Sequence, residues 1–248
     1  MKSIFSVLIS LACVAALARP VNSMLGADGT ELQIEEVSYT ASDYVRDGLV
    51  CMFDAIENVE YGVHDESATR WTDLISGNSY AIGTGNFFGD NYLQVDANTS
   101  RFIPTKDIMN SGNFTIEVVG FCRGSQACVS LGQYPYAFSP YFSWDESQKS
   151  GYFVFARTTM DGPSGTCGQN RMLSAVATYN EGIATIWFPK EYLQKSSATE
   201  IPSTLTKDSN LQRSHQGSVG AIRLYDRALT EEEVYHNFEI DKERFGIW

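Results

Sequence analysis

Basic residues are scarce in this sequence. It carries 18 Lys and Arg against 30 Asp and Glu, a formal net charge of −12 over 248 residues. A nucleic-acid binder needs a basic face that displaces counterions from phosphates, and an anionic membrane attracts the same kind of surface. The sequence has no Lys/Arg cluster of that kind. We therefore expect neither nucleic acid nor an anionic membrane as a partner, and the acidity suits a soluble exported protein.

Familiar hydrolase motifs are also missing. The sequence has no Gly-x-Ser-x-Gly nucleophile elbow, no His-Glu-x-x-His zinc helix and no Gly-rich phosphate loop. Its three histidines, His64, His215 and His236, lie far apart, and His236 is expected at the surface. Retaining glucanases need two carboxylates about 5 Å apart, but no Glu-x-Asp-x-x-Glu strand occurs, and Glu117 stands alone at what we expect to be a solvent-facing position. These absences predict that the chain is not an enzyme.

Long apolar runs are missing except at the N-terminus. After Met1-Lys2, residues 4–17 are almost continuously apolar and lead into the small-x-small site Ala16-Leu17-Ala18. The run is shorter than the roughly 20 residues that span a bilayer. It predicts a secretory signal peptide at residues 1–18, a secreted or cell-surface protein, and no transmembrane segment in the mature chain. A bacterial lipoprotein site at Leu11-Ala12-Cys13 is the less favoured alternative, because Ser10 stands where such sites usually carry Leu.

Four cysteines remain after the predicted signal peptide: Cys51, Cys122, Cys128 and Cys167. An even number in an exported chain permits disulfides. Cys122 and Cys128 flank a short turn-like stretch and could bridge a hairpin, with Cys51 and Cys167 as the second bridge. Four cysteines allow three connectivities, and the sequence alone does not choose among them. Four small buried thiols are an equally weighted alternative. The absence of a Cys-x-x-Cys pair argues against a zinc site.

The rest of the chain consists of short apolar runs separated by Gly, Asn, Asp, Ser and Pro. Such runs predict β-strands, and their close spacing indicates a sandwich or a barrel. Asn180-Glu181-Gly182 predicts a tight hairpin loop between two of them. The predicted strands cover residues 48–53, 91–95, 101–103, 114–121, 127–131, 152–156, 172–179, 183–188 and 218–225.

One helix is predicted near the C-terminus. Thr230 followed by three glutamates forms a capping box, in which the Thr230 hydroxyl accepts from the N–H of Glu233 and the Glu233 carboxylate accepts from the N–H of Thr230. Val234, Phe238 and Phe245 fall on one face of this helix. We therefore expect the helix to lie on the sandwich and bury that face. Trp71 and Trp187 are expected in the core.

Residues 217–234, which contain the last predicted strand and the start of this helix, resemble the closing segment of laminin-G-like jelly rolls. These belong to the concanavalin A-like lectin/glucanase superfamily. Residues 113–118, 173–188 and the opening stretches 48–54 and 71–78 also fit the family pattern, whereas 188–191 departs from it. The resemblance implies an all-β, two-sheet antiparallel jelly-roll sandwich with one short C-terminal α-helix, preceded by a leader at 19–41 and occupying 42–248.

Two kinds of ligand site follow from this reading. Asp54, Asp73 and Asn78 match the family's acidic opening loops, where related folds often hold calcium, although Asp and Asn also initiate turns. The densest aromatic stretch supplies a candidate sugar-binding surface. Its residues are Tyr134, Tyr136, Tyr141, Trp144 and Asp145. Packing of these rings over the core is the alternative.

These observations predict a non-catalytic binding module outside the cell, with a glycan as its ligand. A structural or protein-binding adhesion component, with a cell-surface protein as its partner, is the alternative. A divergent glycoside hydrolase is the least favoured reading. The fold alone does not decide among the three.

Overall fold

The computed structural model describes residues 24–25, 31–32, 38–95, 101–102, 112–122, 130–131, 138–139, 152–155, 158–161, 172–198, 211–212 and 217–247. The chain divides into two compact units, Met1–Ser38 and Tyr39–Trp248. In the first unit, β1 (Met24–Leu25) pairs antiparallel with β2 (Glu31–Leu32). The predicted signal peptide lies outside the described residues, so its cleavage stays a prediction.

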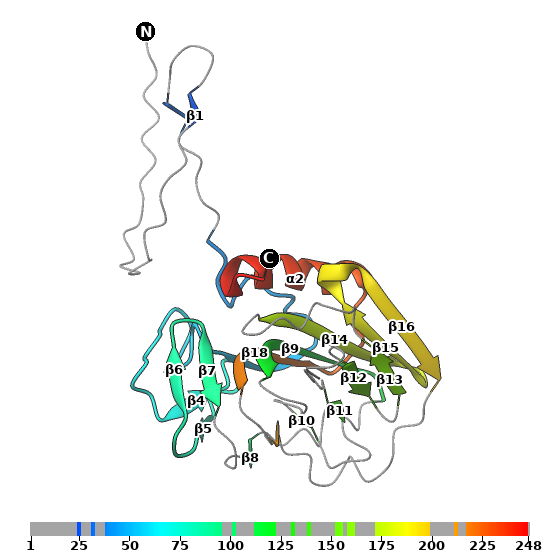
Figure 1. The fold of residues 1–248 in the computed structure, drawn as a ribbon, viewed down its shortest axis with the longest axis horizontal. Coiled ribbons are helices and arrows are strands. Elements are labelled where there is room, and N and C mark those ends of the chain that lie inside the picture. Colours follow the sequence, from blue (N-terminus) through cyan, green and yellow to red (C-terminus); the bar gives the residue numbers. More distant parts are fainter. Residues whose placement is uncertain are drawn as a thin grey trace, which may run out of the picture. The chain divides into compact units, whose positions relative to one another are not determined.

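The second unit is built on an antiparallel sheet of eight strands (Figure 1). Its order is β16 (Leu193–Ala198), β15 (Ile183–Phe188), β14 (Leu173–Asn180), β9 (Phe114–Cys122), β18 (Gly217–Tyr225), β7 (Tyr92–Val95) and β6 (Phe87–Gly89). The eighth strand, β3 (Leu49–Asp54), pairs with β18 beside the point where β7 ends its own pairing. One edge of β18 therefore bonds β9 along its length, and the other edge bonds two strands in turn.

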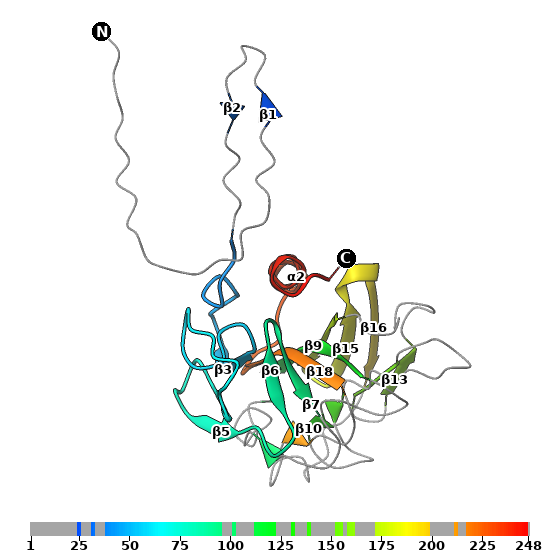
Figure 2. The ribbon, with the colours of Figure 1, turned by 60° about the vertical axis from the view of Figure 1, so that its left-hand side comes forward.

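A second sheet of six short strands lies on one side of the large sheet (Figures 1 and 2). Its order is β13 (Thr158–Asp161), β12 (Tyr152–Phe155), β11 (Phe138–Ser139), β10 (Ser130–Leu131), β17 (Leu211–Gln212) and β8 (Arg101–Phe102). A separate hairpin joins β4 (Arg70–Thr72) to β5 (Ser79–Ala81). The predicted all-β sandwich with a C-terminal helix is confirmed.

The large sheet is covered on both faces, and successive side chains along its strands point to the two sides in turn. On β9, Phe114, Ile116 and Val118 belong to the main apolar core, whereas Val119 packs with the C-terminal helix. Trp71 and Trp187 are buried, as predicted. Phe53, Trp71 and Phe88 meet edge to face in this core, with ring centroids 5.3 and 5.8 Å apart.

The C-terminal helix α2 (Glu231–Phe245) covers the other face of the large sheet; Figure 2 views it end-on. The predicted capping box is confirmed: Thr230 Oγ1 accepts from the Glu233 N–H at 3.3 Å, and Glu233 Oε2 accepts from the Thr230 N–H at 2.9 Å. Val234, Phe238 and Phe245 are buried, as expected. No helix in the described residues combines the length and apolarity that a membrane span requires.

Two short connections link β14, β15 and β16. The predicted hairpin between β14 and β15 is confirmed, with Glu181 and Gly182 at φ 47° and 86°, as a type I′ turn requires. Residues 188–191, which depart from the laminin-G-like pattern, contain the 3₁₀ turn η1 (Pro189–Glu191), and the chain then continues into β16. β16 was not predicted, because its sequence Leu-Gln-Lys-Ser-Ser-Ala has no apolar alternation.

Replacing Thr230 with Ala should lower the free energy of unfolding by about 1 kcal/mol, because the first turn of α2 loses the acceptor for the Glu233 N–H. Thr230→Ser keeps the hydroxyl and should stay close to the wild type. Urea unfolding followed by circular dichroism measures both variants. Equal stability of the Ala and Ser variants would show that the capping box does not hold this helix.

Candidate functional site

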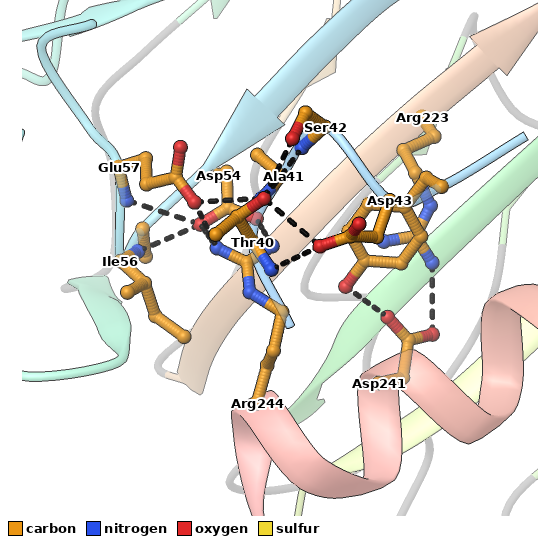
Figure 3. A network of polar contacts seen from close by, with 12 residues as sticks. Thr40, Ala41, Ser42, Asp43, Asp54, Ile56, Glu57, Arg223, Asp241 and Arg244 are labelled. Carbon is orange, nitrogen blue, oxygen red and sulfur yellow. Dashed lines mark hydrogen bonds and ion pairs between the residues drawn. The ribbon is translucent and has the colours of Figure 1, made fainter. Parts of the chain in front are cut away.

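Among the described residues, a dense group of charged side chains lies between the large sheet and α2 (Figure 3). Arg223 on β18 and Glu117 on β9 are register partners, so their side chains leave the sheet side by side. Arg223 Nε donates to Glu117 Oε2 at 2.6 Å, and its Nη2 donates to Asp241 Oδ2 of α2 at 2.8 Å. All three side chains are at most 1% exposed. The prediction that Glu117 faces solvent is therefore wrong, because Arg223 and α2 cover it.

Neutral polar groups complete this cluster. The Tyr44 ring lies 3.9 Å from Arg223 Cζ, and its hydroxyl donates to Asp241 Oδ1 at 2.8 Å. Asn237 Nδ2 donates to Glu117 Oε2 at 2.9 Å, and Ser174 Oγ donates to Asp241 Oδ2 at 2.9 Å. These residues come from the start, the middle and the end of the domain, and all of them surround one guanidinium and its two carboxylates.

A second ion-pair group adjoins the first. Arg244 of α2 donates from Nη1 to Asp54 Oδ2 at 2.6 Å and from Nη2 to Glu57 Oε1 at 2.8 Å. Glu57 also accepts from the backbone N–H of Ala41 at 2.6 Å and from that of Gly62 at 2.8 Å. One carboxylate thus holds the segment before β3, the loop after it and the helix together.

These two ion-pair groups form one buried layer between the large sheet and α2, and burial determines the pKa values of its side chains. It raises the pKa of Glu117, and the neighbouring Arg223 only partly offsets that effect. For Arg223, burial opposes the charged form, but Asp241 and Glu117 outweigh it and hold its pKa well above the ordinary value. Burial also raises the pKa of the Tyr44 hydroxyl. Glu117 Oε1 and Arg223 Nη1 have no hydrogen-bond partner within the part of the chain that the structure describes.

This layer has a tyrosine, carboxylates and a guanidinium together, which are groups that catalytic sites use. Arg223, Glu117, Asp241 and Tyr44 are nevertheless no more than 1% exposed, so they do not contact a substrate in this conformation. Breaking a buried ion pair by removing one partner is strongly destabilising, since the other charge is left uncompensated. We therefore assign the layer the role of holding α2 on the sheet.

The predicted calcium ligands lie in two separate hydrogen-bonded groups. Asp73 Oδ1 accepts from the N–H of Met52 at 2.8 Å, and the backbone N–H of Asp73 donates to the carbonyl of Asn78 at 2.8 Å. Asp54 instead pairs with the cation Arg244. Among the described residues no three His, Cys, Asp or Glu side chains gather as metal ligands would. Asp73 Oδ1 also accepts from the N–H of Ile75 at 3.1 Å, which is the local contact that the turn reading predicts, and the calcium site stays a prediction.

The predicted aromatic sugar surface, Tyr134, Tyr136, Tyr141, Trp144 and Asp145, lies outside the described residues and stays a prediction. Cys128 and Cys167 also lie outside the described residues. Cys51 is a free, buried thiol, which gives no support to a Cys51–Cys167 disulfide. Burial and, secondarily, the carboxylate of Asp73 raise the pKa of Cys51, so the thiol stays protonated and unreactive.

Exposed aromatic side chains occur at other places. Tyr192, directly after η1, is 74% exposed, and its ring stacks on Tyr235 of α2 with centroids 5.4 Å apart and an interplanar angle of 29°. Phe87 on β6 is 51% exposed. Tyr61 is 39% exposed, but the Arg46 guanidinium lies over its ring. None of these exposed rings was predicted from the sequence, because exposure depends on tertiary packing.

No protein-family model and no curated protein matches this chain. Solved structures do match it. A Trypanosoma rangeli sialidase in complex with 2,3-difluoro-KDN is 13% identical with a TM-score of 0.57, over 80% of this chain and 33% of the sialidase. The same enzyme in complex with sialic acid is 13% identical with a TM-score of 0.51, over 94% of this chain and 37% of the sialidase.

A CBM40 domain of Ruminococcus gnavus IT-sialidase bound to α2,3-sialyllactose is 10% identical, over 58% of this chain and 94% of the domain. Its TM-score of 0.44 is too low for a conclusion. The sialidase matches show the β-sandwich fold alone, and the chain spans about a third of the sialidase's length. The narrower laminin-G-like assignment stays a prediction.

The prediction that this chain is not an enzyme needs correction. The matching solved structures include those of a Trypanosoma rangeli sialidase, which is a glycoside hydrolase. Sialidases use a tyrosine nucleophile and are exceptions to the two-carboxylate rule. The missing Glu-x-Asp-x-x-Glu strand therefore does not rule out glycoside hydrolysis, and the inference from that absence was wrong.

Replacing Arg223 with Met should lower the free energy of unfolding by about 3–5 kcal/mol, because Glu117 and Asp241 remain buried without their cation. Arg227→Met is the matched control: Arg227 pairs with Glu233, but its side chain is 26% exposed, and such pairs contribute about 1 kcal/mol or less. Chemical denaturation measures both. Equal losses would contradict the assigned role of the buried layer.

Stability should also depend on pH through Glu117. A carboxyl whose pKa is raised by folding stabilises the native state below its unfolded pKa, and that contribution is lost as pH rises through the folded pKa. We expect Glu117→Gln, which keeps an acceptor for Arg223, to gain stability relative to the wild type as pH rises from about 4. Unfolding curves across pH measure this. A stability difference between the two proteins that stays constant across pH would contradict this expectation.

Proposed function

We propose that residues 39–248 form a carbohydrate-binding domain that acts outside the cell. The observation that carries the proposal is the fold shared with a sialidase whose structure contains sialic acid, over 94% of this chain with a TM-score of 0.51. Sialylated glycans are therefore the ligand class to test first. Export rests on the signal-peptide pattern of residues 1–18.

The described surface supports this proposal chemically. Carbohydrate sites combine aromatic side chains with a few polar groups that fix orientation, and Tyr192 is a strongly exposed ring. The proposal includes a calcium ion with Asp73 and Asn78 as its ligands, because the backbones of these two residues already meet in one turn. Asp54 is the weaker third member, because Arg244 holds its carboxylate.

A glycan array of neutral and sialylated oligosaccharides, probed with purified residues 19–248, tests the proposal. Selective binding is the expected result, and a parallel array with a chelator tests calcium. A fluorogenic sialoside assay accompanies it because the matching structures are hydrolases. Absence of both binding and hydrolysis would overturn the proposal in favour of a protein-binding surface component. Hydrolysis would extend the proposal to a sialidase.

A further inference from the structure

Two contacts hold the exposed Tyr192 ring in place, one in its own turn and one with α2. Pro189 starts the η1 turn, and the Tyr192 N–H donates to the Pro189 carbonyl at 3.1 Å. Tyr192 itself has φ 52° and ψ 33°, a left-handed conformation that glycine or asparagine adopts more easily. The turn therefore fixes the direction in which this side chain leaves the backbone, at a cost in backbone strain.

A second element fixes the ring. Tyr192 stacks on Tyr235, which lies in the second turn of α2, and this helix is fixed by its capping box and by the buried ion pairs of Asp241 and Arg244. With one face on Tyr235, and with 74% of the residue exposed, Tyr192 presents its other face to solvent. We name these two stacked rings the tyrosine platform.

The chemistry of the platform selects its ligand. The face of an aromatic ring is electronegative and attracts weakly positive C–H groups, which a pyranose ring presents on its apolar face. Glu231 lies four residues before Tyr235 in α2, on the same side of the helix, and it is exposed, so the platform borders an exposed carboxylate. A carboxylate accepts hydrogen bonds from sugar hydroxyls and repels an acidic group.

We propose that the tyrosine platform binds the apolar face of a neutral pyranose ring within the glycan. This inference rests on the proposed carbohydrate binding and names the site and the sugar class. The other exposed rings fit less well. The Arg46 guanidinium covers Tyr61, and Phe87 stacks on no second ring among the described residues.

The test compares four proteins on one array of neutral and sialylated oligosaccharides: wild type, Tyr192→Asn, Tyr192→Phe and Phe87→Ala. Asparagine tolerates the left-handed backbone, so the Asn variant should keep or exceed the wild-type melting temperature while its glycan binding falls by about tenfold or more, a change of about 1.4 kcal/mol. Tyr192→Phe keeps the ring and should keep most of the binding. Phe87→Ala should bind like the wild type.

The outcomes separate the two proposals. If the wild type binds glycans and Tyr192→Asn binds them equally well, the platform is not the site, and the proposed carbohydrate binding stands. If the wild type binds no glycan, the proposed function itself fails. If loss of the Tyr192 ring weakened binding only to glycans that consist of acidic sugars, the assignment of the platform to a neutral ring would be overturned. Unchanged melting temperatures confirm that the comparison concerns binding and not folding.

Discussion

The position of the C-terminal helix depends on one buried guanidinium. Arg223 of β18 pairs with Glu117 of β9 and with Asp241 of α2, and all three side chains are almost completely buried. Taking charges out of water costs several kcal/mol per ion unless partners compensate for it. The helix can therefore leave the sheet only by exposing a charge pair. Because the platform includes Tyr235 of the same helix, the orientation of that ring depends on this pairing as well.

The parts of the fold that follow from local sequence could be predicted. Residues 183–188 and 114–121 are rich in β-branched and aromatic residues and form β15 and β9, and the capping box at Thr230 starts α2 where expected. β16 could not be predicted, because Lys195 and its serine neighbours form a strand only by pairing with β15. Glu117 could not be placed either, since its partner Arg223 lies 106 residues away.

The candidate site shows the same limit more strongly. The many rings between Tyr134 and Trp144 predicted a binding surface in that stretch. Tyr192 was not predicted, because it is an isolated ring after a Pro-Lys-Glu turn. What distinguishes Tyr192 is its exposure, its left-handed backbone and its contact with a helix 43 positions further along the chain at Tyr235. The matching sialidase structures agree in fold alone, so they do not choose between these two surfaces.

The Glu57 carboxylate has a consequence for the order in which the chain folds. It accepts from Ala41, Gly62 and Arg244, and Asp54 beside it also needs the guanidinium of Arg244. A ribosome makes the two acidic residues long before it makes their cation, and in that interval neither charge has its buried partner. The loop that Gly62 belongs to therefore reaches its final form late, when nearly the whole domain has been synthesised.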